Sequence, residues 1–130
     1  MVMRGEYYFL SNMYPCTIVY EGHQYKSSES AFQAQKDLSR TSEFEDLDGY
    51  AAKKLGRKVN LRKDWESVKL NIMEGILRAK FKDPILAKKL KEVKEPIVEE
   101  NTWNDTYWGV CNGKGSNHLG ILLEKIKKEL

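Results

Sequence analysis

The sequence lacks long apolar runs and proline-rich or glycine- and serine-rich stretches, and it has only two cysteines. No apolar segment approaches the roughly 20 residues that a helix needs to cross a bilayer, so we expect no membrane-spanning segment. Residues 1–6 are too polar for a signal peptide. Cys16 and Cys111 lie far apart in a chain without a secretory signal, so we expect two reduced thiols and a cytoplasmic protein.

A strong excess of one charge is also lacking. The 130 residues carry a formal net charge of +3, and this small surplus does not by itself indicate nucleic-acid binding. With 41% hydrophobic residues and no internal repeat or linker, residues 1–130 are predicted to form a single domain with one core. No pattern in the sequence indicates an oligomeric state.

The first structured segment is predicted to be a β-hairpin followed by a helix. Residues 16–26 contain a β-branched and aromatic run, a Glu-Gly turn and a short return strand. Ser27 or Ser28 can then cap a helix that begins near Glu29.

Capping signals divide the next part of the chain into short helices. Ser42 and Glu45 fit a capping box for a short segment. Asp48 can cap a helix over residues 49–55, which Gly56 ends.

Helical periodicity is strongest between Trp65 and Phe81, where apolar residues recur on one face and favour a core position for Trp65. Asp83 as N-cap and Pro84 at the first helical position begin the next helix. Residues 96–100 are predicted to form a short strand.

The last predicted helix follows Asn117, which is a favourable N-cap residue. Its core-facing residues are predicted to be Leu119, Leu122, Leu123, Ile126 and Leu130. The fold class is therefore α+β and predominantly helical, with a small β-hairpin or sheet element.

A first polar cluster lies near the start of the chain. Glu29, Gln33 and Lys36 share one helical face. An ordinary exposed polar face of a helix would show the same spacing. Small residues on the packing side and the preceding hairpin favour a buried position, where a carboxyl and an amine could act as general acid/base and nucleophile. Asn12 and Tyr14 could simply belong to a turn before a proline. Alternatively, Asn12 is an amide ligand for a hydroxyl group and Tyr14 is a surface on which a ligand stacks.

A second polar cluster lies near the end of the chain. Trp108 beside Gly109 suits a flat ligand lying against backbone, and Asp105 could orient a water or bind ribose hydroxyls. A turn aspartate and a core tryptophan explain the same pattern equally well. Residues 113–117 enter a helix start, which is either an anion site assisted by Lys114 or a simple N-cap. The histidines and cysteines have no metal-ligand spacing, so no metal site is predicted.

Motifs of one family follow in order over nearly the whole chain. They are Phe9-Leu10-Ser11-Asn12, Tyr14-Pro15, Tyr25, Ser28-Glu29, Phe32-Gln33-Ala34, Lys36, Ala52, Leu55-Gly56-Arg57, Trp65, Met73, Lys80-Phe81, Leu90, Asp105, Trp108-Gly109, Gly115, Asn117 and Leu119-Gly120. As a set they resemble the NADAR family, also called the YbiA-like family, which is named for links to NAD and ADP-ribose metabolism. Met13 and Ser116 depart from the family pattern.

The resemblance implies a compact, largely helical N-glycosidase that acts on ribosylated amines without a cofactor. One branch is similar to enzymes that cleave early phosphorylated intermediates of riboflavin biosynthesis, and another to enzymes that remove ADP-ribose from guanine in nucleic acid. The partner would be a small phosphorylated ribosyl metabolite, which we favour, or ADP-ribosylated guanine in nucleic acid. The alternative is a non-catalytic module that binds ADP-ribose or a nucleotide, and the intact Glu29 and Lys36 pair argues against it.

The chemistry of the bond suggests roles for the catalytic candidates. The lone pair of an exocyclic nitrogen can open ribose to an imine, so Lys36 would be the covalent nucleophile and Glu29 would shuttle the proton. In a non-covalent alternative, Glu29 or Asp105 activates water at an oxocarbenium-like centre.

The resemblance also implies roles for the binding candidates. Asn12 and Asp105 would hold ribose hydroxyls, Trp108 would stack on the base and Gly109 would allow close approach. Candidates for the phosphate contact are Arg57 and the helix start that contains Gly115 and Asn117. Tyr14 and Gln33 are candidates for the remaining substrate contacts.

Overall fold

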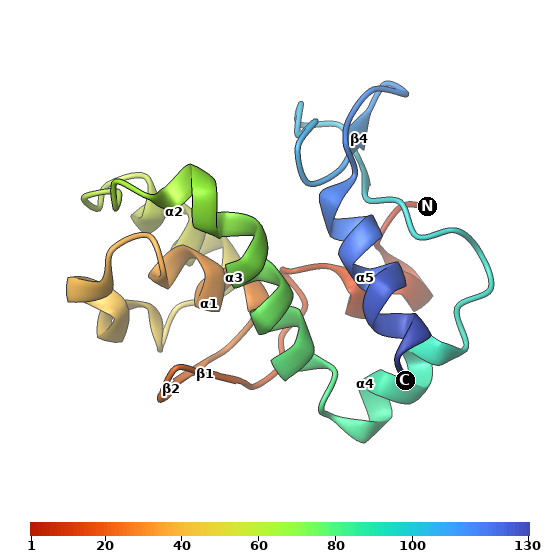
Figure 1. Ribbon diagram of the computed structural model, residues 1–130, viewed down its shortest axis with the longest axis horizontal. Helices are drawn as coiled ribbons and strands as arrows, with labels where there is room; N and C mark the ends of the chain where they lie inside the picture. Colours follow the sequence, from red (N-terminus) through yellow and green to blue (C-terminus); the bar gives the residue numbers. More distant parts are fainter. The chain divides into compact units, whose positions relative to one another are not determined.

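The computed structural model describes residues 1–130 and divides into two compact units (Figure 1). The middle unit is Asn12–Lys80, and the terminal unit joins Met1–Ser11 to Phe81–Leu130. The expectation of one domain over the whole chain stays a prediction. No helix is both long enough and apolar enough to span a membrane. The two cysteines form no disulfide, as expected.

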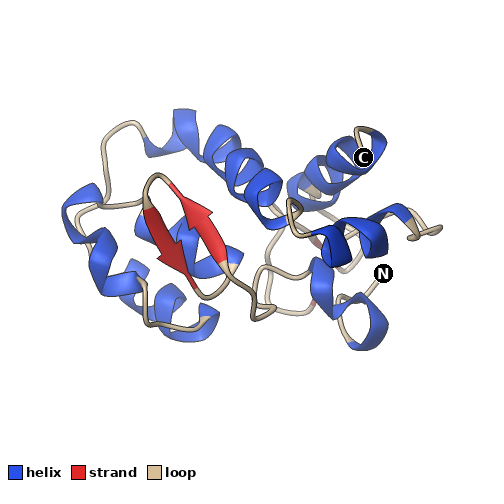
Figure 2. Ribbon diagram, turned by 90° about the horizontal axis from the view of Figure 1, so that it is seen from below, coloured by secondary structure: helices blue, strands red, loops and turns tan.

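The middle unit begins with the predicted hairpin. Strands β1 (Ile18–Tyr20) and β2 (His23–Tyr25) pair antiparallel, and Figure 2 shows them as two red arrows. Ile18 and Tyr25 lie opposite each other and are almost fully buried, since the hairpin packs on α1 and α3. The hairpin prediction is confirmed.

Helix α1 (Ser28–Ala34) starts where the sequence predicts. The side chain of Ser27 accepts a hydrogen bond from the backbone N–H of Ser30 over 3.0 Å, which confirms Ser27 as the N-cap. The buried side of α1 carries small residues and Phe32, whose ring lies 4.9 Å from that of Trp65. The helix therefore lies deep in the unit.

The next two segments test the capping predictions. The 3₁₀ segment η2 (Leu38–Phe44) begins earlier than expected, because Asp37 accepts the N–H of Ser39, so the capping box at Ser42 is wrong. Helix α2 (Gly49–Gly56) is confirmed, and Asp48 accepts the N–H of Ala51 over 2.8 Å.

Helix α3 (Trp65–Lys80) is the longest helix and confirms the periodic stretch. Its buried face carries Trp65, Met73, Ile76, Leu77 and Lys80. Trp65 is 6% exposed, which confirms the core position favoured by its spacing.

The terminal unit contains the 3₁₀ segment η1 (Gly5–Leu10) and helices α4 (Pro84–Lys91) and α5 (His118–Lys128). Asp83 caps α4 through the N–H of Ile85, as predicted. Four of the five predicted core residues of α5 are buried, namely Leu119, Leu122, Leu123 and Ile126. Leu130 is 42% exposed because α5 ends before it, so its core assignment is wrong.

Two very short strands, β3 (Glu100–Asn101) and β4 (Val110–Cys111), pair in parallel. The strand predicted over residues 96–100 is therefore wrong except at Glu100. The backbone before it is bonded by the side chain of Asn117, which accepts from the N–H of Glu99 and donates to the carbonyl of Ile97. Asn117 occupies the N-cap position of α5 but makes no side-chain capping bond to the helix.

Candidate active site

In the middle unit, the Glu29, Gln33 and Lys36 side chains of the first cluster lie near one another along α1. Gln33 Nε2 donates to Glu29 Oε2 over 2.6 Å, and the two residues are one helical turn apart. Gln33 is only 5% exposed, whereas Glu29 and Lys36 are half-buried. An acid and an amine thus lie within interaction range, and a buried amide holds the acid.

Lys36 follows the end of α1, and its Nζ lies 5.9 Å from the centroid of the Trp65 ring. Burial lowers the pKa of Lys36 below its ordinary value of 10.5, although the nearby Glu29 carboxylate opposes this effect. A lowered pKa increases the neutral fraction of the amine, and only a neutral amine is a nucleophile.

Three further cations lie close enough to Lys36 to lower its pKa: Arg57, Lys53 and Lys69. Arg57 is exposed just beyond the end of α2, and Lys53 lies in the last turn of that helix. This positive rim beside the acid and amine suits a phosphorylated ligand.

Helix α2 packs closely on the catalytic candidates. A Cβ on Gly49 would meet Glu29 and Met13, and a Cβ on Gly56 would overlap the Gln33 amide. The approach of α2 to α1 therefore depends on these two glycines. Met13, a departure from the family pattern, fills space against Gly49.

Asn12 lies beside the first turn of α1. Its backbone carbonyl accepts the N–H of Glu29 over 2.9 Å, and its Oδ1 accepts from Ser28 Oγ over 2.8 Å. Its Nδ2 points at the sulfur of Met73 at 3.8 Å. The structure thus places Asn12 beside Glu29, and the side chain of Asn12 is oriented by its hydrogen bond with Ser28.

Tyr14 lies near Lys80, which the sequence analysis listed among the family motifs but to which it gave no role in the site. The Nζ atom of Lys80 lies 5.8 Å from the centroid of the Tyr14 ring, and Lys80 is only 1% exposed. Burial lowers the pKa of Lys80 to about 8. A signal was available, since Lys80 falls at helical spacing on the apolar face of α3, where a lysine is unusual.

The second cluster lies in the terminal unit, on the loop between β3 and β4. Asp105 Oδ1 accepts the backbone N–H groups of Tyr107 and Trp108 over 3.1 and 2.9 Å. The buried amide of Asn101 bonds the backbone of Asp105 at both its N–H and its carbonyl. Asp105 therefore shapes the loop with one carboxylate oxygen, and Asn101 was missed.

Gly109 allows a close approach to its backbone, and in the structure the group that approaches is Glu99. A Cβ on Gly109 would overlap the carboxylate and backbone oxygens of Glu99. Glu99 Oε2 accepts from Asn101 Nδ2 over 2.9 Å, and the Glu99 carbonyl accepts from Val110. The structure thus places a second carboxylate, Glu99, beside the predicted ligand-binding segment.

The start of α5 was a candidate for the phosphate contact. The backbone N–H groups of residues 116–119 donate to the carbonyls of residues 106–109, including Asn117 to Gly109. Gly115 has φ +147, and a Cβ there would overlap the Gly109 carbonyl. These helix-start donors are occupied by the loop, so Gly115 and Asn117 hold the Trp108–Gly109 segment in place.

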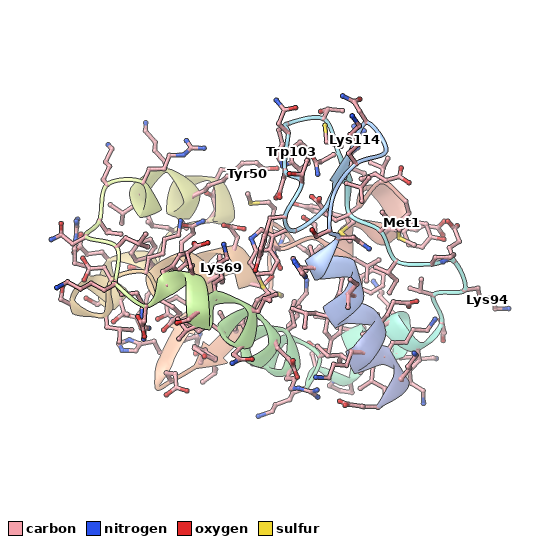
Figure 3. All side chains as sticks on the ribbon, turned by 45° about the horizontal axis from the view of Figure 1, so that its top comes forward. Met1, Tyr50, Lys69, Lys94, Trp103 and Lys114 are labelled. Carbon is pink, nitrogen blue, oxygen red and sulfur yellow. The ribbon has the colours of Figure 1, made fainter.

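An aromatic cluster surrounds Trp108. The rings of Tyr107 and Trp108 meet edge to face with centroids 4.9 Å apart, and the His118 ring lies 4.5 Å from that of Tyr107. Trp103, labelled in Figure 3 on the loop before Asp105, is 59% exposed.

Comparison with known proteins identifies the family of this chain. The NADAR domain matches residues 2–130. The N-glycosidase YbiA of Shigella flexneri is 38% identical over 132 residues, which cover 96% of this chain and 82% of that protein. A riboflavin biosynthesis protein of Vibrio vulnificus is 35% identical over 94% of this chain and 35% of its own length.

The fold also matches a solved structure. The NMR structure of Escherichia coli YbiA superposes with a TM-score of 0.86 at 35% identity, over 99% of this chain and 81% of that one. This match confirms the predicted fold class. With relatives named N-glycosidases matched over nearly its whole length, this chain belongs to the NADAR family and is an N-glycosidase.

Proposed function

We propose that this enzyme hydrolyses the bond between ribose and an exocyclic amine of a phosphorylated ribosyl compound. The two candidate substrates are a phosphoribosyl intermediate of riboflavin biosynthesis, which we favour, and an ADP-ribosylated guanine. The observation that carries the proposal is the pairing in the middle unit of Glu29 with an amine, Lys36, whose pKa is lowered by burial.

The reaction begins with the substrate's own nitrogen. Its lone pair expels the ring oxygen, which takes up a proton from solvent water, and leaves an iminium at C1′. The neutral Nζ of Lys36 adds to C1′, and Glu29 takes the proton that the new bond releases from Nζ. Glu29 then returns this proton to the departing nitrogen, and the amine leaves. Water adds to the protonated Lys36 Schiff base, and the adduct breaks down to release the open-chain sugar as its aldehyde. Lys36 then loses one proton to solvent, which balances the proton taken up by the ring oxygen and restores the neutral amine.

The phosphate contact is assigned to the cations beside Lys36. Arg57 and Lys53 carry charges that interact with Lys36, so an anionic group bound to them would lie near the reacting amine. The riboflavin biosynthesis relative of Vibrio vulnificus is consistent with a phosphorylated metabolite as substrate.

In the terminal unit, we assign ribose hydroxyls to Asp105 and base stacking to Trp108. Asp105 uses Oδ1 for the loop, and the same carboxylate can accept a hydroxyl at its other oxygen. Tyr14 and Asn12 are assigned to substrate binding in the middle unit. Gly109, Gly115 and Asn117 support the Trp108 segment.

The proposal is tested by product release from both substrates, measured by mass spectrometry. The wild type should release the free base or amine from one of them. Glu29→Gln should lose activity by about 10²- to 10⁴-fold, the usual range for a general acid–base group. If the wild type releases nothing from either substrate while ADP-ribose still binds, the assignment of substrate and reaction is wrong.

Trapping with borohydride distinguishes the mechanism with a covalent Schiff base from direct attack by water. Reduction during turnover should attach the sugar to Lys36, as a stable mass increase on the peptide that contains it. Lys36→Arg should abolish both the adduct and activity, whereas Lys54→Arg, an exposed lysine on α2, should change neither. Full activity in Lys36→Arg would exclude the Schiff base and leave water activated by Glu29 or Asp105.

A further inference from the structure

The amide of Gln33 lies in a position that costs the fold stability. Its Nε2 donates to Glu29 over 2.6 Å, but its Oε1 is buried and has no hydrogen-bond partner. Gln33 is only 5% exposed, so its amide lies away from bulk solvent. A buried acceptor without a donor is unfavourable, and a side chain kept for stability alone would not hold one.

Gly56 provides the space for this amide. A Cβ on Gly56 would overlap both Oε1 and Cδ of Gln33. Gly56 does not have a left-handed backbone, so its conformation is open to any residue. Close approach of the Gln33 amide is therefore the reason for a glycine at the end of α2.

The direction of the amide is linked to the charge of Glu29. An N–H donor facing the carboxylate stabilises the ionised form. The reversed amide would bring Oε1 to Glu29, and a hydrogen bond there would need a protonated carboxyl. The observed hydrogen bond therefore fits an ionised Glu29 at rest.

We propose that Gln33 is a positioning residue that holds Glu29 in one orientation as an ionised base, with Gly56 as the space that admits it. Glu29 is then ready to take the first proton from Lys36. This assignment rests on the proposed N-ribosyl hydrolysis and replaces the substrate contact expected for Gln33.

Gln35 supplies a matched control on the same segment. It is 4% exposed, and its Nε2 donates to the Ala31 carbonyl over 2.9 Å and to the Tyr25 hydroxyl over 3.4 Å. These bonds serve the fold and do not reach Glu29. Gln33 and Gln35 therefore allow a comparison of two buried glutamines with different roles.

The experiment compares Gln33→Met with Gln35→Met. Gln33→Met should keep or raise the Tm, lower kcat about tenfold or more with little change in KM, and move the acid limb of the pH profile to higher pH. Gln35→Met should lower the Tm and leave kcat per folded molecule unchanged. A raised KM with a normal kcat in Gln33→Met would show that Gln33 binds the substrate. A lowered Tm with a normal kcat would show that Gln33 has only a structural role. Either result overturns the inference.

Two further measurements keep the test decisive. If Gln33→Met does not fold, Gln33→Glu keeps the size of the side chain and places a second carboxyl beside Glu29, so an unchanged pH profile would contradict our assignment. If the wild type hydrolyses neither substrate, the proposed function fails on its own. The inference is then judged by NMR titration of the Glu29 carboxyl, which Gln33→Met must shift to higher pH.

Discussion

Lys80 offers the sharpest test of the energetics of this fold. Lys80 is the last residue of α3 and is 1% exposed, and its ammonium lies near the Tyr14 ring. Burial lowers its pKa from the ordinary 10.5 to about 8, and the charge of Cys16 only partly opposes this effect. A tenfold change in an equilibrium constant is worth about 1.4 kcal/mol, so the shift corresponds to about 3 kcal/mol.

How the free energy of unfolding changes with pH follows from whether the folded or the unfolded chain holds the proton on Lys80. Between pH 8 and 10.5 the unfolded chain keeps a proton on Lys80 that the folded chain has released. The free energy of unfolding therefore rises with pH across this window. It is lowest below pH 8, where the folded protein must bury the ammonium.

The Lys80→Met variant keeps a long side chain and removes the charge. We expect it to be more stable than the wild type at pH 7, by up to about 3 kcal/mol, and equally stable near pH 10.5. Urea unfolding at several pH values between 7 and 10.5 measures this difference. Tyrosines whose pKa is raised, such as Tyr25, titrate in both proteins and cancel in the comparison.

Lys82→Met is the matched control, because Lys82 is exposed two residues further along the chain. It should change stability by no more than about 0.5 kcal/mol at any pH. Lower stability of Lys80→Met at pH 7, or a difference from the wild type that does not vary with pH, would refute the reasoning.

Two further predictions concern the terminal unit. Gly109→Ala should lower the free energy of unfolding by about 2 kcal/mol or more, because its Cβ would displace the Glu99 carboxylate and backbone; a Tm within error of the wild type would contradict this. Asn117→Ala should cost about 1–3 kcal/mol, because it removes the bonds to Glu99 and Ile97. Asn117 has φ +53, so Asn117→Gly should cost less than Asn117→Ala in urea unfolding, and the reverse order would show that backbone strain is negligible.

The elements that local chemistry decides could be predicted from the sequence. Ser27, Asp48 and Asp83 begin helices because each caps an N–H two or three residues ahead. The hairpin follows from its turn and β-branched residues, and α3 from its apolar period. Each of these signals lies within a few residues of the structure that it determines.

The wrong prediction of a strand over residues 96–100 depends on a partner distant in sequence. Residues before Glu100 do not form a strand, because the side chain of Asn117 takes their backbone bonds. At the start of α5, the N–H groups of residues 116–119 donate to the carbonyls of residues 106–109, which also lie outside the local pattern. No local pattern indicates such partners. Lys80 could be recognised as a lysine on an apolar helical face and stood among the family motifs, but it was given no role in the site.

Gly56 and Gly109 can be explained by the same physical argument, each within its own unit. The sequence favours Gly56 as the end of a helix and Gly109 as a place for a ligand. Gly56 does end α2, and in the structure each glycine also leaves room for a polar side chain, the Gln33 amide in the middle unit and the Glu99 carboxylate in the terminal unit. Both side chains are further held by a hydrogen bond of 2.6 or 2.9 Å. A glycine in such a motif can thus mark the protein's own preorganised acid rather than the substrate, because a carboxylate is most useful where its orientation is already fixed.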